Sequence, residues 1–148
     1  MIEPLGSVTR ISIAEATMTE LQMLDEIEAI ADFGLAGDRH AGNPARQVSI
    51  QSQAELNTAS QRLGRPIDCD LSRRNITLDR GALPRTRGQR LWLGEAELEV
   101  FADAAPCSLM TAQFGDGARE ALKRLAGIHC RVFTGAMIRI GDQLRLPE

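Results

Sequence analysis

One cysteine follows the end of a strand pattern. Residues 98–103 begin as an alternating strand, and Ala104, Ala105 and Pro106 lead from it to Cys107. Proline lacks a backbone donor and fixes its own φ, so we expect the strand to end here and Cys107 to face a cleft. A thiolate at such a place could be a nucleophile, a sulfur carrier or a soft-metal ligand. Alternatively, Cys107 is a buried small hydrophobe, as free cysteines commonly are.

A glycine-rich loop carries the second set of candidate groups. Residues 34–44 contain three glycines, an asparagine and a proline, which predicts a loop. Glycines let backbone N–H groups approach a ligand closely, and the run Asp38-Arg39-His40 could orient or bind one. The alternative is that Asp38 forms an Asx turn and His40 is a surface side chain.

Arginines dominate residues 73–90, where Asp79 is the single acid among six arginines. Guanidinium groups suit phosphate or carboxylate recognition, and Arg73, Arg74 and Asn75 at a strand start could hold a phosphate and a heterocycle edge together. The alternative is ordinary solvated arginines, because Lys123 is the only lysine and arginine could be this chain's default cation.

Ser52 is the predicted N-cap of a helix that runs to Leu63 and ends at Gly64. Glu55 stands at the capping-box position three residues later. The helix N-terminus offers unpaired N–H groups to an anion, so Ser52 is a candidate binding residue as well as a simple cap.

The positions of these groups depend on many short strands with tight turns. Two strands, 90–93 and 96–100, form a hairpin through Gly94-Glu95 with alternate residues facing inward. Further strands are expected at 7–14, 46–50, 73–78, 130–133, 137–140 and 143–146, and a second helix at 115–125. The spacing of apolar residues in 23–33 allows either a helix or a strand, and we favour a strand. This pattern predicts a mainly β fold, a small β-barrel with a few short helices, whose closure would remove exposed sheet edges.

Composition limits the protein class. The 148 residues, 43% of them hydrophobic, fit a single domain over residues 1–148. The start lacks a signal-peptide layout, and three cysteines at 69, 107 and 130 make no disulfide framework, so we expect a cytoplasmic protein with reduced thiols. A net charge of −3 gives no electrostatic reason to expect nucleic acid or a membrane as partner.

The sequence lacks the residue patterns that several reaction classes require. The sequence has no cysteine pair with zinc spacing and no Gly-x-Ser-x-Gly elbow. A Cys107–His40 pair, which would make a thiol hydrolase or transferase, stays open because catalytic partners meet in space. Together, the remaining features describe a thiolate facing a pocket for an anionic, heterocyclic ligand.

The order and spacing of five segments resemble the MOSC family, the domain named for the C-terminus of molybdenum-cofactor sulfurases. The resemblance covers nearly the whole chain, from about position 7. The segments are Gly34–Gly42, Arg46–Ser49, Arg73–Asn75, Ala105–Ser108 and Arg131–Asp142.

The resemblance implies a MOSC-like β-barrel, also called pyruvate-kinase-like, with the family's invariant cysteine at Cys107. In members similar to the mitochondrial amidoxime-reducing component, that cysteine ligates molybdenum beside the pterin dithiolene. By the same carry-over, Arg73 and Asn75 would hold the pterin and its phosphate, and Asp38, Arg39 and His40 would line the pocket. The implied cofactor is the molybdenum cofactor, and pyridoxal phosphate binding is a further expectation for the family.

The implied reaction is two-electron reduction of a small N-hydroxylated substrate, with electrons from a separate redox protein. A rival hypothesis is a sulfur-carrier or cofactor-handling protein that receives sulfur from a donor as a persulfide on Cys107. A third is a binding module with a free thiol. The chain departs from the family pattern in two ways: it is expected to be a bare domain, and Leu109 stands where many members carry a basic residue.

Overall fold

The structure is a computed structural model that describes residues 4–16, 19–104 and 108–147. Five strands come first, followed by one helix and a short 3-10 turn at Cys69–Ser72, then three strands, two helices and three final strands. The strands are β1 (Gly6–Ile13), β2 (Gln22–Leu24), β3 (Glu26–Ile30), β4 (Gly34–Leu35), β5 (Val48–Ser52), β6 (Ile76–Leu78), β7 (Arg90–Leu93), β8 (Ala96–Asp103), β9 (Ile128–Thr134), β10 (Ala136–Arg139) and β11 (Gln143–Arg145). The helices are α1 (Gln53–Leu63), α2 (Ser108–Phe114) and α3 (Ala118–Ala121).

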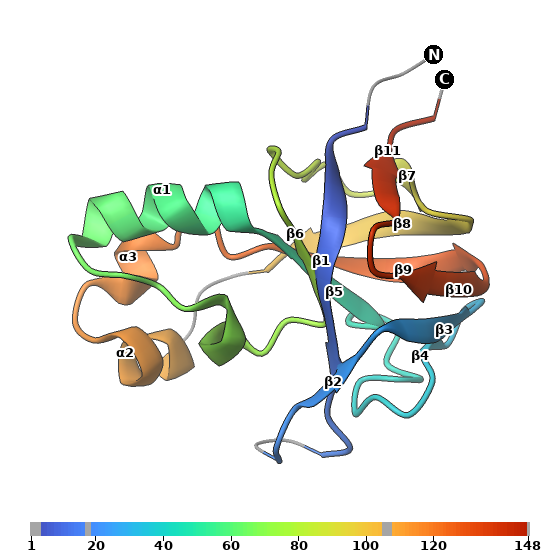
Figure 1. Ribbon diagram of the computed structural model, residues 1–148, viewed down its shortest axis with the longest axis horizontal. Coiled ribbons are helices and arrows are strands. Elements are labelled where there is room, and N and C mark those ends of the chain that lie inside the picture. Colours follow the sequence, from blue (N-terminus) through green and yellow to red (C-terminus); the bar gives the residue numbers. More distant parts are fainter. Residues whose placement is uncertain (1–3, 17–18, 105–107, 148) are drawn as a thin grey trace.

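A closed β-barrel forms the larger part of the molecule (Figure 1). Its strands follow the order β11-β7-β8-β9-β5-β6-β1, and β1 pairs with β11 to close the ring, while β2 extends the sheet from β1. The pair β5–β6 is parallel and its connection contains α1, as a parallel crossover requires. The predicted mainly β barrel is confirmed.

Alternation along the strands fills the barrel. The predicted inward residues of the β7–β8 hairpin, Leu91, Leu93, Ala96, Leu98 and Val100, are all fully buried. Cys130 on β9 is also fully buried in this core, and burial raises the pKa of its thiol. Its predicted role in core packing is confirmed.

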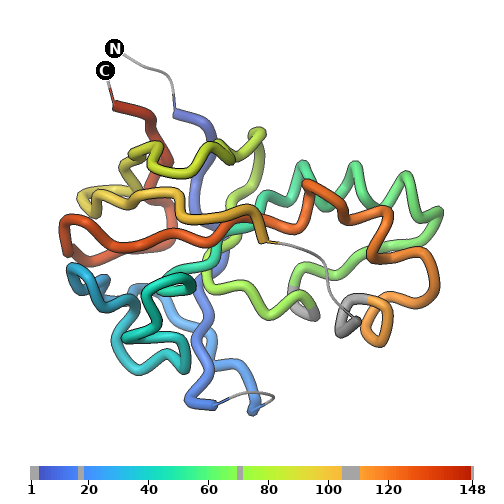
Figure 2. Tube along the Cα trace, turned by 180° about the vertical axis from the view of Figure 1, so that it is seen from behind, coloured from blue at the N-terminus to red at the C-terminus, as the bar shows by residue number. Residues whose placement is uncertain are grey.

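A second, smaller core lies among the helices, which pack together beside the barrel (Figure 2). Its buried side chains include Leu56 of α1, Phe114 of α2 and Leu122 just after α3. All five residues of β5 are buried, as expected for a strand covered on both faces. Within the described ranges, no helix combines the length and apolar character needed to cross a membrane.

Helix α1 follows its predicted boundaries. The Ser52 hydroxyl accepts from the Glu55 amide at 3.4 Å, and Gly64 ends the helix with a φ of 78°. The Glu55 carboxylate does not return to the cap. It accepts two hydrogen bonds from Arg85 at 2.8 and 2.9 Å, and Arg85 also reaches Asp103, so this network joins the helix to the barrel.

Two sequence expectations about the elements are wrong. The helix expected at 115–125 is shorter: Gly115 and Gly117 take φ values of 92° and 88°, so the helix begins only at Ala118, and it ends at Ala121. The expected loop at 34–44 begins with the short strand β4, which pairs with β3 in a separate sheet of order β10-β3-β4. Tertiary pairing thus extends the sheet into a glycine-rich segment.

Candidate functional site

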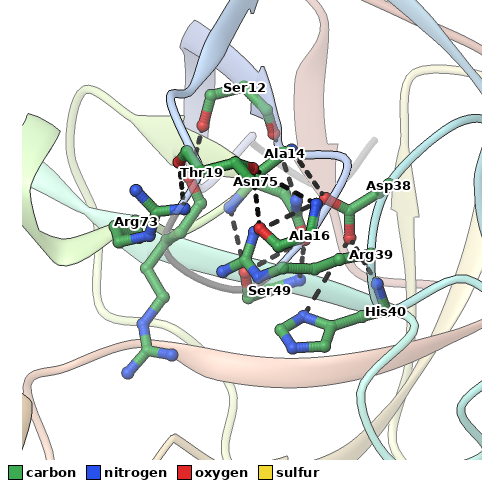
Figure 3. Close-up of polar contacts among 11 residues, drawn as sticks. Ser12, Ala14, Ala16, Thr19, Asp38, Arg39, His40, Ser49, Arg73 and Asn75 are labelled. Atoms are coloured by element: carbon green, nitrogen blue, oxygen red, sulfur yellow. Dashed lines mark hydrogen bonds and ion pairs between the residues drawn. The ribbon is translucent and has the colours of Figure 1, made fainter.

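Asp38 connects the loop after β4 to the end of β1 through hydrogen bonds. Its side chain is fully buried, and its two carboxylate oxygens accept hydrogen bonds from the amides of Ala14, at 3.2 Å, and His40, at 3.1 Å. The Arg39 amide donates to the Ala14 carbonyl at 2.7 Å. These hydrogen bonds hold the loop against the end of β1. They thereby fix the backbone from which the side chains of Arg39 and His40 extend (Figure 3).

Arg39 is a mostly buried cation with spare hydrogen-bonding capacity. Its side chain is 13% exposed, and Nη1 lies 3.7 Å from an Asp38 oxygen, too far for a hydrogen bond. Nη1 is buried and makes no hydrogen bond to the described residues. Burial lowers the pKa of Arg39, Asp38 opposes the shift and Arg73 adds to it. A buried donor of this kind is expected to meet an acceptor from a ligand or water.

Asn75 joins three strands beneath this loop. Its Oδ1 accepts from the amide and hydroxyl of Ser49 at 3.0 and 3.1 Å, and its Nδ2 donates to the Ser12 carbonyl at 3.1 Å. Asn75 is 2% exposed. Its amide thus fixes the distance between β1, β5 and the start of β6, which positions the two arginines before it.

Arg73 and Arg74 lie on the same side of the barrel. Arg73 has a φ of 61°, which non-glycine residues seldom adopt, and its guanidinium donates to the Thr19 carbonyl at 2.6 Å. The Nε of Arg74 donates to the Ala126 carbonyl at 3.0 Å, and the Arg74 carbonyl accepts from the Ser12 hydroxyl. Arg73 is near enough to Arg39, and Arg74 near enough to His40, to lower the pKa of that residue further than burial does alone. Figure 3 shows Arg73 with its bond to Thr19.

Both histidines of the chain belong to this region. Burial, together with Arg39, Arg46 and Arg74, lowers the pKa of His40, and Asp38 opposes the shift. Burial, Arg74, Arg46 and His40 lower the pKa of His129 to about 4. Both imidazoles are therefore neutral at pH 7. We call the group of Arg39, His40, Arg46, Arg73, Arg74 and His129, with Asp38 as its carboxylate, the basic cluster.

The structure brings together most of the residues predicted from the sequence. Asp38, Arg39, His40, Arg73 and Arg74 belong to the basic cluster, and Asn75 supports it.

Ser52 is elsewhere: it is three residues along β5 from Ser49, about 10 Å at 3.3 Å per residue. Its hydroxyl donates to the Gly81 carbonyl at 2.7 Å. Cys107, predicted as the catalytic residue and metal ligand, lies outside the described residues. Among those residues, no group of three or more histidine, cysteine or acidic side chains could hold a metal.

His129 and Arg46 are site residues that the sequence reasoning missed. His129 lies on β9 opposite Ser49 of β5, between the core residues Ile128 and Cys130. Alternation from Cys130 would have placed His129 on the outer face. Pairing of β9 with β5, which brings it to the cluster, joins segments about 80 residues apart and has no local signal.

Comparison with known structures supports this architecture. The YUAD protein from Bacillus subtilis superposes with a TM-score of 0.78 at 19% identity, covering 97% of both chains. YiiM from Geobacillus stearothermophilus gives 0.67 at 16% identity, covering all of this chain and 76% of the other. YiiM from Escherichia coli gives 0.66 at 14% identity, covering 96% and 70%. These likenesses establish the fold.

A search of curated proteins finds no match. The family model of the MOSC domain matches residues 37–145, which include the whole basic cluster. This match covers well over half of the chain and agrees with the barrel and its neighbours. The chain belongs to the MOSC domain family.

Proposed function

We propose that this protein binds a molybdenum cofactor in the basic cluster, with the Cys107 thiolate as a metal ligand, and reduces N-hydroxylated compounds. The family is associated with this cofactor. The observation that carries the proposal is the buried Nη1 of Arg39, which lacks a hydrogen-bond partner among the described residues and lies in a region dominated by cations.

The donor set fits the anionic part of the cofactor. Arg73 is close enough to Arg39 to lower the pKa of Arg39 further than burial does alone, and Asp38 is the carboxylate that opposes this shift. A phosphate monoester carries about −1.5 to −2 at pH 7 and accepts charge-assisted hydrogen bonds from guanidinium groups. Arg39 and Arg73 would hold such a phosphate, and Asp38 would keep the Arg39 side chain in place.

When bound, the cofactor supplies two-electron chemistry at molybdenum, which suits a soft thiolate ligand. The net reaction takes two electrons and two protons and converts the N-hydroxyl compound to its reduced form and water. The protein's own groups bind and orient: Arg39 and Arg73 through charge, and Asn75 through the strands that it joins. We further propose a separate electron-transfer protein as donor and a cytoplasmic location, where the thiol stays reduced.

Pyridoxal phosphate does not fit the described cluster. Its covalent chemistry requires a lysine amine. The chain has one lysine, Lys123, and it is exposed in the helical part, in an open groove with Thr111, Arg119 and Glu120. None of these residues belongs to the basic cluster.

Replacing Arg39 tests the proposal. We expect Arg39→Met to retain less than about a tenth of the wild-type molybdenum after purification, because a charge-assisted hydrogen bond to a buried anion contributes about 1.5–3 kcal/mol. Molybdenum per chain, measured by mass spectrometry of the metal, gives the readout.

Arg119→Met is the matched control, since Arg119 is an exposed arginine of α3. We expect it to carry as much molybdenum as the wild type. If Arg39→Met, shown to be folded by circular dichroism, kept a full complement of molybdenum, the basic cluster would not be the cofactor site.

A further inference from the structure

His129 is a buried imidazole that the proposed cofactor contacts leave unused. It lies on β9 between Ala102 of β8 and Ser49 of β5. Its sequence neighbours Ile128 and Cys130 belong to the barrel core, so its side chain lies on the outer face, in the basic cluster. Its Nδ1 is buried and makes no hydrogen bond to the described residues. Arg39 and His129 thus each contribute one buried, unsatisfied nitrogen to the same cluster.

The charges around His129 come from several elements. Arg46 before β5, Arg74 before β6 and His40 from the loop all disfavour a proton on it. The acids nearby are engaged elsewhere: Asp38 lies beside Arg39 and His40, and Asp103 at the end of β8 is paired with Arg85 at 2.8 Å. His129 is therefore a neutral imidazole in a positive field, and no carboxylate of the described residues is paired with it.

We infer that His129 contacts the ligand of the basic cluster, and that its imidazole takes up a proton when a doubly charged oxyanion binds there. The oxyanion would offset the fields of Arg46 and Arg74 and supply acceptor oxygens to Arg39 Nη1 and His129. Removing the repulsion and adding an opposite charge both favour the imidazolium form. Proton uptake and anion binding are then linked, and each strengthens the other.

This inference rests on the site of the proposed function but not on molybdenum. The ligand class is a sulfate- or phosphate-like dianion, whether it belongs to a cofactor, to a substrate or to the free ion. A protonated imidazole would hold one proton within the site, and the proposed reduction consumes two. Binding of a simple oxyanion tests His129 directly, and the metal content tests the cofactor separately.

Calorimetry with inorganic sulfate measures the linkage, because sulfate does not itself titrate between about pH 5 and pH 7. Titrating tag-free, metal-free protein in two buffers of different ionisation enthalpy gives the protons taken up per sulfate. We expect roughly 0.5–1 proton for the wild type near pH 6, and an affinity that falls up to about tenfold per pH unit as the pH rises. His129→Gln should still bind sulfate, with no uptake and little dependence on pH.

His40→Gln asks whether the other histidine of the cluster carries the proton. If His129 carries it, protons are still taken up for each sulfate bound in this variant, whatever the change in sulfate affinity. Proton uptake that persists in His129→Gln, or that disappears in His40→Gln alone, would overturn the assignment. A wild type that binds no sulfate at about 10 mM would also overturn it, because there would be no anion binding to which proton uptake could be linked.

Ring resonances of the wild type provide a second measurement, which follows each histidine directly. The chain has two histidines, so His40→Gln suffices to assign both rings by nuclear magnetic resonance. The His129 ring should titrate at about 4 without sulfate and about two pH units higher, or more, with saturating sulfate. An unchanged midpoint would contradict proton uptake at His129.

Discussion

Cys107→Ala is expected to lose more than about 100-fold of the activity toward an amidoxime, measured with an artificial electron donor. Replacing outer-shell partners of metal ligands typically costs 10–100-fold, and removal of a ligand itself should cost more. The variant should keep the wild-type circular dichroism and unfolding midpoint, because the proposed role of Cys107 is chemical.

Cys130→Ala is the control for this experiment. Cys130 is fully buried in the barrel, and burial raises the pKa of its thiol, so a thiolate there is disfavoured at neutral pH. We expect this variant to lose some stability and to keep its activity. Equal activity in Cys107→Ala and the wild type would remove Cys107 from the mechanism. A wild type with no molybdenum and a Cys107 about 32 Da heavier would favour the sulfur-carrier hypothesis instead.

Asn75→Ala should destabilise the protein by about 3 kcal/mol, the largest loss of stability that we expect from a single side chain of the site. The substitution removes the acceptor of the Ser49 amide and hydroxyl and the donor to the Ser12 carbonyl. Because these partners are buried backbone and hydroxyl groups, each loses a hydrogen bond that water cannot readily replace. Denaturant unfolding followed by fluorescence of Trp92 would measure the change.

Asn57→Ala is the corresponding control. Asn57 is exposed on α1, and its side chain accepts one hydrogen bond from Gln53 at 2.9 Å. We expect a change within about 0.5 kcal/mol for this variant. A loss below about 1 kcal/mol in Asn75→Ala would mean that the strands keep their spacing without this side-chain amide. Asn75 would then not be the residue that positions Arg73 and Arg74.

Local chemistry predicted much of the fold. The hairpin at 90–100 followed from alternation and a two-residue turn, and α1 followed from the Ser52 cap and Gly64. The helix expected at 115–125 is shorter in the structure because Gly115 and Gly117, with positive φ, delay its start to Ala118. The capping-box spacing predicted the Ser52 cap but not the partner of the Glu55 side chain. The Glu55 carboxylate pairs with Arg85, 30 residues away.

The site was predictable only where its residues are adjacent in sequence. Asp38, Arg39 and His40 form one run, and Arg73, Arg74 and Asn75 form another, so their polar character was visible. That the two runs meet beside His129 depends on barrel pairing between distant strands. Such pairing is set by the closure of the whole sheet and not by any local pattern.

The proposed reductase activity requires that this domain bind a molybdenum cofactor. Metal analysis of the wild type, purified from a host that makes the cofactor, measures this binding. We predict about one molybdenum per chain, bound together with the pterin, and its loss in Cys107→Ala. A folded wild type that carries no molybdenum would rule out the proposed function for this domain, and the sulfur chemistry of Cys107 would then be the property to measure.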